Sequence, residues 1–279
     1  MYVERIQIRE SMAVMYPVWI GIQGPRHYTP TFAGYEGTQY SGNITAGSCK
    51  RIKRAVDLLL QLSPEEIIFN PVSQAWHPFR INFITLTISD IIIRDPKEVF
   101  KMCMVPMLQW LRDHGIKHYI WKAELQARGQ VHYHITTNKF ILWTEIKDHW
   151  NKLQRKAGYL KNYVQKEGHY HPNSIDVHAV NSIKDIGSYL TKYIAKNVSK
   201  NDPTRAIPGK VWDCSNSLKS KFFSTEADYL LQERLEYLRG LGMPEVRTDH
   251  CLIFKQPYKV ILPKNYQRQY HLFLTALND

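Results

Sequence analysis

Two histidines separated by one residue, His132 and His134, stand in the stretch of this chain best suited to chemistry, residues 121–137 (WKAELQARGQVHYHITT). On both sides of Gly129 apolar and polar residues alternate, which is the pattern of two half-buried strands joined by a turn. Because side chains two residues apart in a strand point to one face, the two imidazoles lie side by side on the polar face. They are candidate metal ligands, although a hairpin with ordinary polar-face histidines has the same pattern.

The length of the turn decides whether Glu124 joins the two histidines. A two-residue turn would pair Glu124 with Tyr133 and send the carboxylate to the opposite face. A three-residue loop ending in a left-handed Gly129 pairs Glu124 with His132 and keeps the apolar side chains together, and it is a common hairpin form. We therefore expect this loop, with Gln126 as the substitute third ligand if the turn has another length. Imidazole with carboxylate and no thiolate suits Mn, Mg or Zn.

Periodic patterns before the hairpin predict a strand and a helix that position it. Alternation around FITLTIS indicates a strand within residues 78–89. The pair Asp95-Pro96 is a helix start, a cap followed by proline. This helix should run to about residue 114, with Pro106 placed to kink it.

The pattern after the hairpin completes an α+β fold. Thr144 is expected to cap a second helix that ends near Gly158, a strand follows at 174–180, and Ser182 opens a third helix to about residue 199. Strand, helix, strand, strand, helix, strand is the ferredoxin-like order βαββαβ. We expect an antiparallel sheet with two helices on one face and the third helix across the other.

Two tyrosines of that third helix, Tyr189 and Tyr193, lie four residues apart and therefore on one face. Lys192 follows the first tyrosine by three residues, and Lys196 follows the second. Taken alone, the pattern is also that of an amphipathic helix with packed tyrosines and solvated lysines. Beside a metal-binding hairpin, the phenols become candidate nucleophiles.

Three motifs in order, FITLT, Glu-x7-His-Tyr-His and Tyr-x-x-Lys-Tyr-x-x-Lys, resemble those of the HUH endonucleases. The nearest likeness is to replication initiators of small single-stranded DNA phages and rolling-circle plasmids, and it covers roughly residues 50–200. The resemblance implies a divalent metal ion, Mg or Mn, held by two histidines and an acid, and attack on DNA by one or two helix tyrosines. Those roles fall on His132, His134 and Glu124 for the metal, and on Tyr189, Tyr193, Lys192 and Lys196 for the strand transfer.

The resemblance implies nicking and joining of single-stranded DNA through a 5′-phosphotyrosine, which initiates rolling-circle replication. Both tyrosines act in turn, or one acts alone, in which case we favour Tyr193. A transposase or mobilisation relaxase would use the same chemistry. Two other classes stay open: a non-catalytic DNA-binding protein, and a metal-dependent hydrolase that uses water. Expected partners are single-stranded DNA at a replication origin and a separate helicase.

The composition favours a polyanionic partner. The 279 residues carry a net charge of +12 with a pI near 9.4. Residues 151–200 hold nine Lys/Arg against three Asp/Glu, so +6, half of the total, falls in this segment. Basic and aromatic residues here could follow a DNA backbone and stack on unpaired bases, together with polar-face threonines. The predicted DNA-contacting residues are Thr85, Thr87, Lys152, Arg155, Lys156, Tyr159, Lys161 and Tyr163.

Several classes of protein are not indicated. The apolar runs are too short for a membrane span, and neither a signal peptide nor a P-loop motif occurs. The four cysteines show no Cys-x-x-Cys spacing, which predicts reduced thiols and a cytoplasmic location, in the host cell if the protein is viral. We expect three segments: an N-terminal arm with a basic helix (1–75), an endonuclease core (76–200) and a C-terminal extension (201–279).

Patterns in the outer segments are weaker. Residues 1–48 suggest an irregular arm, and 48–62 an amphipathic helix with four cations at its start. In the extension we expect a helix within 222–241, and strands near 251–254 and 258–262.

Three further groups resemble site residues. The tripeptide His169-Tyr170-His171 is expected in a loop, Asp176 and His178 at the far side of the sheet, and Asp185 as a helix-capping residue.

Overall fold

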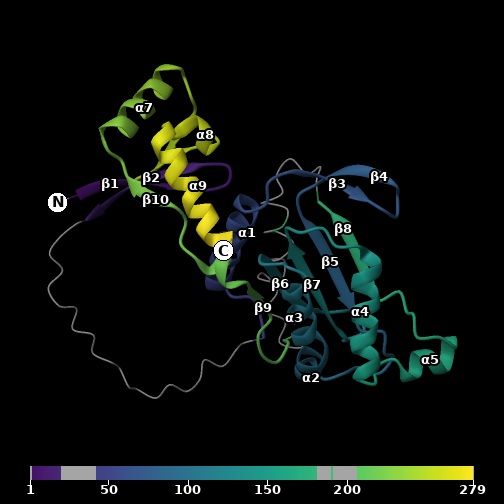
Figure 1. The fold of residues 1–279 in the computed structure, drawn as a ribbon. Helices are drawn as coiled ribbons and strands as arrows, with labels where there is room; N and C mark the ends of the chain where they lie inside the picture. Colours follow the sequence, from purple (N-terminus) through teal and green to yellow (C-terminus); the bar gives the residue numbers. More distant parts are fainter. Residues whose placement is uncertain (1, 20–41, 181–189, 191–205, 279) are drawn as a thin grey trace, which may run out of the picture. The chain divides into compact units, whose positions relative to one another are not determined.

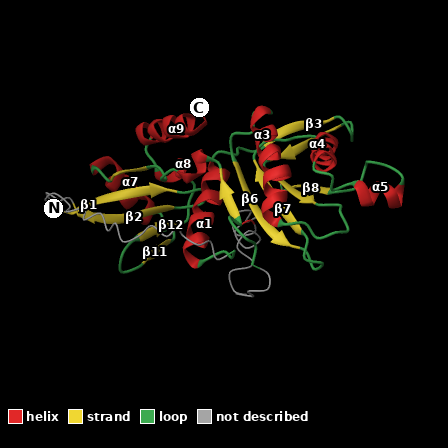
Figure 2. Ribbon diagram, turned by 90° about the horizontal axis from the view of Figure 1, so that it is seen from below, coloured by secondary structure: helices red, strands yellow, loops and turns green. Residues whose placement is uncertain are grey.

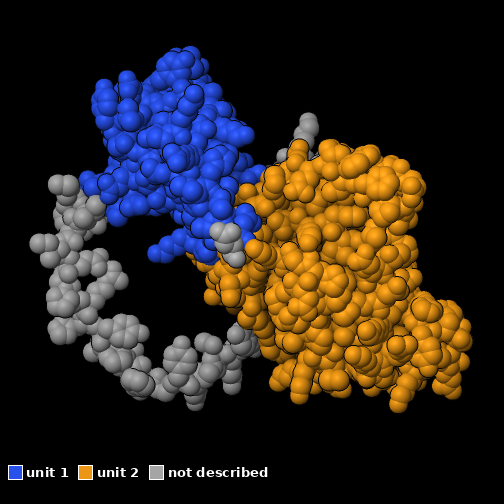
Figure 3. All heavy atoms as spheres, in the orientation of Figure 1, with its two compact units in different colours: residues 1–39, 220–279 blue, residues 40–219 orange. Residues whose placement is uncertain are grey.

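The computed structural model describes residues 2–19, 42–180, 190 and 206–278. The chain forms two compact units, a terminal unit (residues 1–39 and 220–279) and a core unit (residues 40–219), coloured blue and orange in Figure 3. These units differ from the three expected segments, because both ends of the chain contribute to the terminal unit. The basic helix, which we expected in the arm, belongs to the core unit.

A five-stranded antiparallel sheet organises the core unit (Figure 1). All of its neighbouring strands are antiparallel, which confirms the α+β class and all four strands expected for the core. The order across the sheet is β8 (Ile175–Ala179), β5 (Asn82–Thr87), β7 (Val131–Thr137), β6 (Tyr119–Leu125) and β9 (Trp212–Cys214). Strand β5 begins later than expected because residues 78–79 belong to a hairpin that the sequence analysis did not predict, β3 (Glu66–Asn70) and β4 (Ala75–Phe79).

Helices cover the apolar face of this sheet (Figure 2). Phe100 packs against Trp121 and Tyr133, whose side chains share that face, and the buried Trp150 donates its indole N–H to the carbonyl of Thr87. The covering elements are α2 (Pro96–Val99), the π-helical turn η1 (Phe100–Met104), α3 (Val105–Asp113) and α4 (Trp143–Lys156). Helix α5 (Lys161–Glu167) follows α4 and was not expected.

The expected disturbance at Pro106 takes the form of the π-helical turn. Proline has no N–H to donate within a helix, and the preceding turn widens so that the Val105 N–H donates to the Phe100 carbonyl. Asp95 caps the first turn as expected, accepting the Lys97 N–H. Thr144 does not cap α4: the extended residue is Leu142, so the helix begins two residues earlier than expected and Thr144 lies in its first turn.

The basic helix α1 (Ala46–Gln61) is confirmed, with the Thr45 hydroxyl accepting the Ser48 N–H as its cap. It contacts β6 and the short 3-10 helix η3 (Asn216–Lys219).

The terminal unit shows that the expectation of an irregular arm was wrong for residues 2–19. Their two strands pair with each other as a hairpin, and each also pairs with a strand from the C-terminal part of the chain, at residues 224–226 and 252–254. The second of these confirms the strand expected near 251–254. The sheet order is β10 (Ser224–Glu226), β1 (Tyr2–Ile8), β2 (Ala13–Trp19), β12 (Leu252–Phe254) and β11 (Glu245–Arg247).

Three helices complete the terminal unit. Helix α7 (Tyr229–Gly240) confirms the helix expected within 222–241. The expected strand at 258–262 is wrong: the segment is helix α8 (Tyr258–Ile261), which begins after Pro257, and the unexpected α9 (Lys264–Asn278) follows it. Ile261, Tyr266 and Tyr270 are buried in the hydrophobic core of this unit, so the apolar residues that suggested a strand belong to a helical packing surface.

All four cysteines are free thiols, as expected. None of the helices in the described ranges is long and apolar enough to cross a lipid bilayer.

Gly129, in the β6–β7 turn, has φ +87, a conformation that costs an L-residue about 1–2 kcal/mol. We predict that Gly129→Ala lowers the free energy of unfolding of the core unit by this amount, measured by urea denaturation. Gly47→Ala in α1 is the matched control, because its φ is not positive and its surroundings leave room for a methyl group; it should be neutral or slightly stabilising. Equal stability of Gly129→Ala and the unsubstituted protein would contradict the turn geometry.

His149 of α4 stacks on Trp110 of α3, with ring centroids 4.7 Å apart, and its buried Nε2 has no hydrogen-bond partner among the described residues. Burial, and then the nearby Lys152 and His114, lower the pKa of His149 to about 4. In the unfolded chain His149 has its ordinary pKa near 6.5, so between pH 6.5 and pH 4 the unfolded state binds more protons than the folded state. The folded protein therefore loses stability as the pH falls through this range.

We predict that protonation of His149 costs the core unit about 1–2 kcal/mol between pH 6.5 and pH 4, after allowance for partial exposure. His149→Phe keeps the stacked ring and should flatten the curve of unfolding free energy against pH in this range. Parallel curves for the two proteins would refute the assignment.

Candidate functional site

The β6–β7 turn is the expected three-residue loop. The Gln126 N–H donates to the Gln130 carbonyl at 2.8 Å, and the left-handed Gly129 donates its N–H to the Gln126 carbonyl at 2.9 Å. This closure sets Glu124 directly opposite His132. The register that brings a carboxylate to both histidines is therefore confirmed.

Three side-chain donor atoms converge on the polar face of the sheet. His134 Nε2 lies 3.0 Å from Glu124 Oε2 and 2.9 Å from His132 Nε2, and His132 Nε2 lies 3.5 Å from the same carboxylate oxygen. Atoms that bind one ion at about 2.0–2.2 Å are separated by distances of this order. Among the described residues, this is the one group of three or more metal-ligating side chains that lie together. The donor set therefore fits a divalent metal ion.

Gln126, the substitute ligand, is not part of this group. It lies in the turn, where its amide oxygen accepts a hydrogen bond from Arg128 at 2.9 Å.

His134 is fixed in orientation by its neighbours on β5. The Thr85 hydroxyl hydrogen-bonds Nδ1 at 3.1 Å, and the Phe83 ring stacks on the imidazole at 5.5 Å between centroids. With Nδ1 engaged, Nε2 is the nitrogen directed at the other two donors. Contacts of this kind hold a metal-binding imidazole in its required tautomer and angle. Thr85, which we predicted to contact DNA, thus has an observed contact with a candidate metal ligand.

Lys122 is a site residue that the sequence analysis missed. Its side chain is only 1% exposed, and Nζ donates to Glu124 Oε1 at 2.6 Å. One carboxylate oxygen is therefore held by the lysine while the other faces the histidines. The available signal was alternation, since Lys122 precedes Glu124 by two residues and shares its face.

The electrostatics favour the ionised form of Glu124 and the neutral form of His134. Burial raises the pKa of Glu124, but hydrogen bonds from His132 and His134 and the charge of Lys122 outweigh it, so the pKa lies below its ordinary value. Burial lowers the pKa of His134 despite the neighbouring carboxylate. Ionised carboxylate and neutral imidazole are the metal-binding forms.

The predicted DNA-contacting residues of α4 and α5 lie apart from the convergent donors. Helix α4 packs on the apolar face of the sheet, opposite Glu124 and the histidines, and its Lys152, Arg155 and Lys156 are exposed. Lys161 and Tyr163 lie on α5, and Thr87 is half-buried at the end of β5. Tyr159 requires a correction: its ring is only 1% exposed, with the Arg94 guanidinium over it, so it cannot stack on a base.

The predicted nucleophiles and their lysines, Tyr189, Tyr193, Lys192 and Lys196, lie outside the described residues, as does Asp185. Their roles stay predictions.

The other histidine groups do not assemble a comparable site. His169, Tyr170 and His171 lie in an exposed loop, as expected. Asp176 and His178 pair with each other at 2.7 Å on the outer strand β8, and both are more than 60% exposed.

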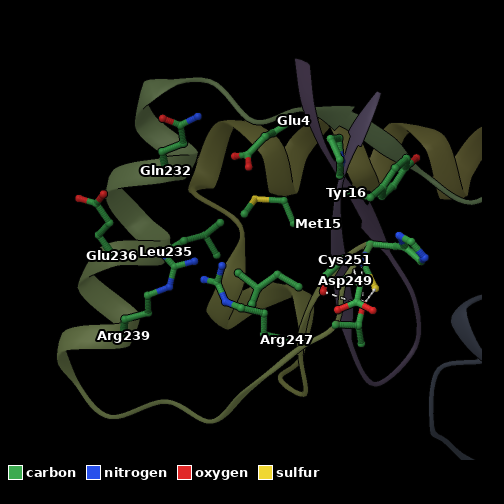
Figure 4. Close-up of a pocket in the computed structure, with 14 residues that line it drawn as sticks. Glu4, Met15, Tyr16, Gln232, Leu235, Glu236, Arg239, Arg247, Asp249 and Cys251 are labelled. Atoms are coloured by element: carbon green, nitrogen blue, oxygen red, sulfur yellow. Dashed lines mark hydrogen bonds between the residues drawn. The ribbon is translucent and has the colours of Figure 1, made fainter. Parts of the chain in front are cut away.

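A pocket of about 400 Å³ lies in the terminal unit between α7 and the sheet (Figure 4). Arg239 and Arg247 line it, but both engage Glu245, at 2.8 and 3.8 Å. The pocket holds none of the donors described above.

Comparison with known families agrees with this geometry. Residues 81–198 match the model of a family described as "Replication-associated protein ORF2". Over this stretch, which is less than half of its length, the chain is similar to that family. The replication-associated segment includes β5, the β6–β7 hairpin, α4 and β8, and so contains every convergent donor. No curated protein and no solved structure matches the chain.

The three motifs indicated a resemblance to replication initiators, and the match to a replication-associated family confirms this resemblance. The match does not test the HUH chemistry.

Removing the Thr85 hydroxyl should loosen His134 without altering a donor atom. We predict that Thr85→Val, which keeps the side-chain shape, weakens Mn²⁺ binding about 10- to 100-fold in titration calorimetry. Thr85→Ser retains the hydroxyl and should bind nearly as well as the unsubstituted protein. If Thr85→Val binds Mn²⁺ with unchanged affinity, the hydroxyl does not orient this ligand.

Proposed function

We propose that the core unit is an HUH-type endonuclease and joining enzyme that nicks single-stranded DNA and initiates rolling-circle replication. The observation that carries the proposal is the convergence of Glu124, His132 and His134 within a replication-associated family segment. The strand order β8-β5-β7-β6 within an antiparallel sheet, and the helices on one face, support a ferredoxin-like arrangement. The proposal includes a separate helicase that opens duplex DNA for this enzyme.

The proposed metal site assigns a task to each side chain. Glu124, His132 and His134 would hold Mg²⁺ or Mn²⁺, which supplies Lewis-acid polarisation of the scissile phosphate. Lys122 holds one oxygen of Glu124 and keeps the carboxylate ionised, while Thr85 aims His134. These contacts preorganise the ligands before DNA arrives, which reduces the reorganisation needed during the reaction.

The proposed chemical step is an exchange of phosphate esters. The hydroxyl oxygen of Tyr193, or of Tyr189, attacks the phosphorus; an oxygen–phosphorus bond forms, and the bond from phosphorus to the DNA 3′ oxygen breaks. The phenol loses its proton and the leaving oxygen gains one, giving a 5′-phosphotyrosine and a free 3′-OH. Lys192 and Lys196 would stabilise charge on the phosphate or the leaving oxygen. The ester bond is conserved, so the reverse reaction joins DNA without ATP.

The test is formation of a covalent adduct. We predict that the protein, incubated with Mn²⁺ and a random-sequence pool of single-stranded oligonucleotides, gives a DNA-bearing band that survives SDS. Tyr189→Phe plus Tyr193→Phe should abolish it, and Glu124→Ala should reduce it by at least about 100-fold because a metal ligand is lost.

The single tyrosine variants show whether one phenol or both act. A nicked product without an adduct would indicate a hydrolase that uses water. DNA binding with neither product nor adduct would indicate a binding protein. An adduct that persists in the double tyrosine variant would refute the assigned nucleophiles.

A further inference from the structure

Four cations occupy the first half of α1: Lys50, Arg51, Lys53 and Arg54. All four are exposed, and none forms an ion pair with a described residue. Positive charge near a helix N-terminus opposes the helix dipole, and the first turn of α1 has no acidic residue to offset it. The helix fold therefore does not account for this cluster, whereas an anionic partner would.

The cluster lies beside the sheet face that carries the metal-site donors. Lys122 is opposite His134 on one side and opposite Trp212 of β9 on the other, so Trp212 shares the face of the histidines. The Arg51 guanidinium lies over the Trp212 ring, 6.0 Å from its centroid. Both Figure 1 and Figure 2 show α1 next to β6, in agreement with their contact.

The half-exposed Trp212 gives this surface an aromatic element as well as charge. Surfaces that bind single-stranded nucleic acid combine cations for the phosphates with aromatic rings for the bases, and arginine planes add to the stacking. The cross-strand row from His134 through Lys122 to Trp212 connects this surface to the convergent donors. By contrast, the cations of α4 lie beyond the opposite face of the sheet.

We propose that α1 and Trp212 bind the single-stranded DNA that flanks the scissile phosphate. Lys50, Arg51 and Arg54 contact backbone phosphates, and Trp212 with Arg51 stacks on an unpaired base. The proposal rests on the proposed function, since it specifies how substrate reaches that site. The proposed substrate-binding helix, α1, lies outside the family-matched segment. The proposal therefore places substrate on α1 and not on the basic surface of α4.

Three matched pairs of substitutions test the proposal. Each pair removes two exposed cations spaced four residues apart on a helical segment of the core unit: Lys50→Gln with Arg54→Gln, Lys97→Gln with Lys101→Gln, and Lys152→Gln with Lys156→Gln. Affinity for a fluorescein-labelled single-stranded oligonucleotide of mixed sequence is measured by anisotropy without metal, over a series of salt concentrations. Cleavage therefore cannot affect the result, and circular dichroism confirms that each variant is folded.

The α1 pair is expected to lose about 10-fold in affinity, with a salt dependence shallower by about 1.4, the value for two lost phosphate contacts on a single strand. The pair at Lys97 and Lys101 should change affinity less than 3-fold. Equal losses in all three pairs would show a general charge effect and overturn the proposal. A loss confined to the α4 pair would overturn it in favour of that surface.

Trp212 supplies an independent readout, because its replacement leaves the charge unchanged. Trp212→Ala should weaken binding about 10-fold with an unchanged salt dependence, and Trp212→Phe should restore most of it. An unaltered affinity for Trp212→Ala would exclude stacking at this position.

Failure of this surface is distinguishable from failure of the nuclease proposal. With Mn²⁺, the α1 pair should need about 10-fold more oligonucleotide than the unsubstituted protein to reach half-maximal adduct formation, in line with its loss of affinity. If the unsubstituted protein forms an adduct and the α1 pair binds DNA as tightly as it does, this binding surface fails and the nuclease proposal stands. If the unsubstituted protein forms no adduct while the α1 pair still loses affinity, the nuclease proposal fails and the binding surface stands.

Discussion

The candidate site depends on one small piece of backbone, the loop that joins β6 to β7. A strand has a side-chain period of two, so one residue more or less in this loop would move Glu124 to the other face of the sheet. The left-handed Gly129 and the Gln126–Gln130 hydrogen bond fix the loop at three residues. A conformational preference of glycine thus determines whether a carboxylate joins the two histidines.

Buried charge is the second constraint on the site. Placing Glu124 and Lys122 in a largely buried position is costly unless each is compensated, and the 2.6 Å contact between them provides that compensation. The carboxylate remains ionised while one oxygen faces the imidazoles. The buried Lys122 lies opposite His134 on one side and opposite Trp212 on the other. The convergent donors and the proposed DNA-binding surface therefore share one cross-strand row of the sheet.

The two faces of the core sheet have different tasks. The apolar face is packed by α2, η1, α3 and α4, with Trp121, Tyr133 and Trp150 buried. The polar face carries the convergent donors and has α1 beside it. Because of this separation, closeness to the motifs in the sequence does not mean closeness to the donors in space. Lys152 and Lys156 lie within the matched family segment, but on the helix that packs on the apolar face. Lys50 and Arg54 lie outside that segment, on the helix beside the polar face.

The sequence by itself determined the features that local periodicity and turn chemistry encode. Alternation predicted β5, β6, β7 and β8, Asp95-Pro96 predicted a helix start, and Gly129 predicted the loop that aligns Glu124 with His132, because each depends on residues close together in the chain. Only the tertiary structure showed that Lys122 contacts Glu124, that Thr85 contacts His134, that Tyr159 is buried, and that residues 2–19 pair with strands near the C-terminus. Those features arise from contacts between segments that are far apart in the chain. The residue pattern of a single segment does not specify such contacts.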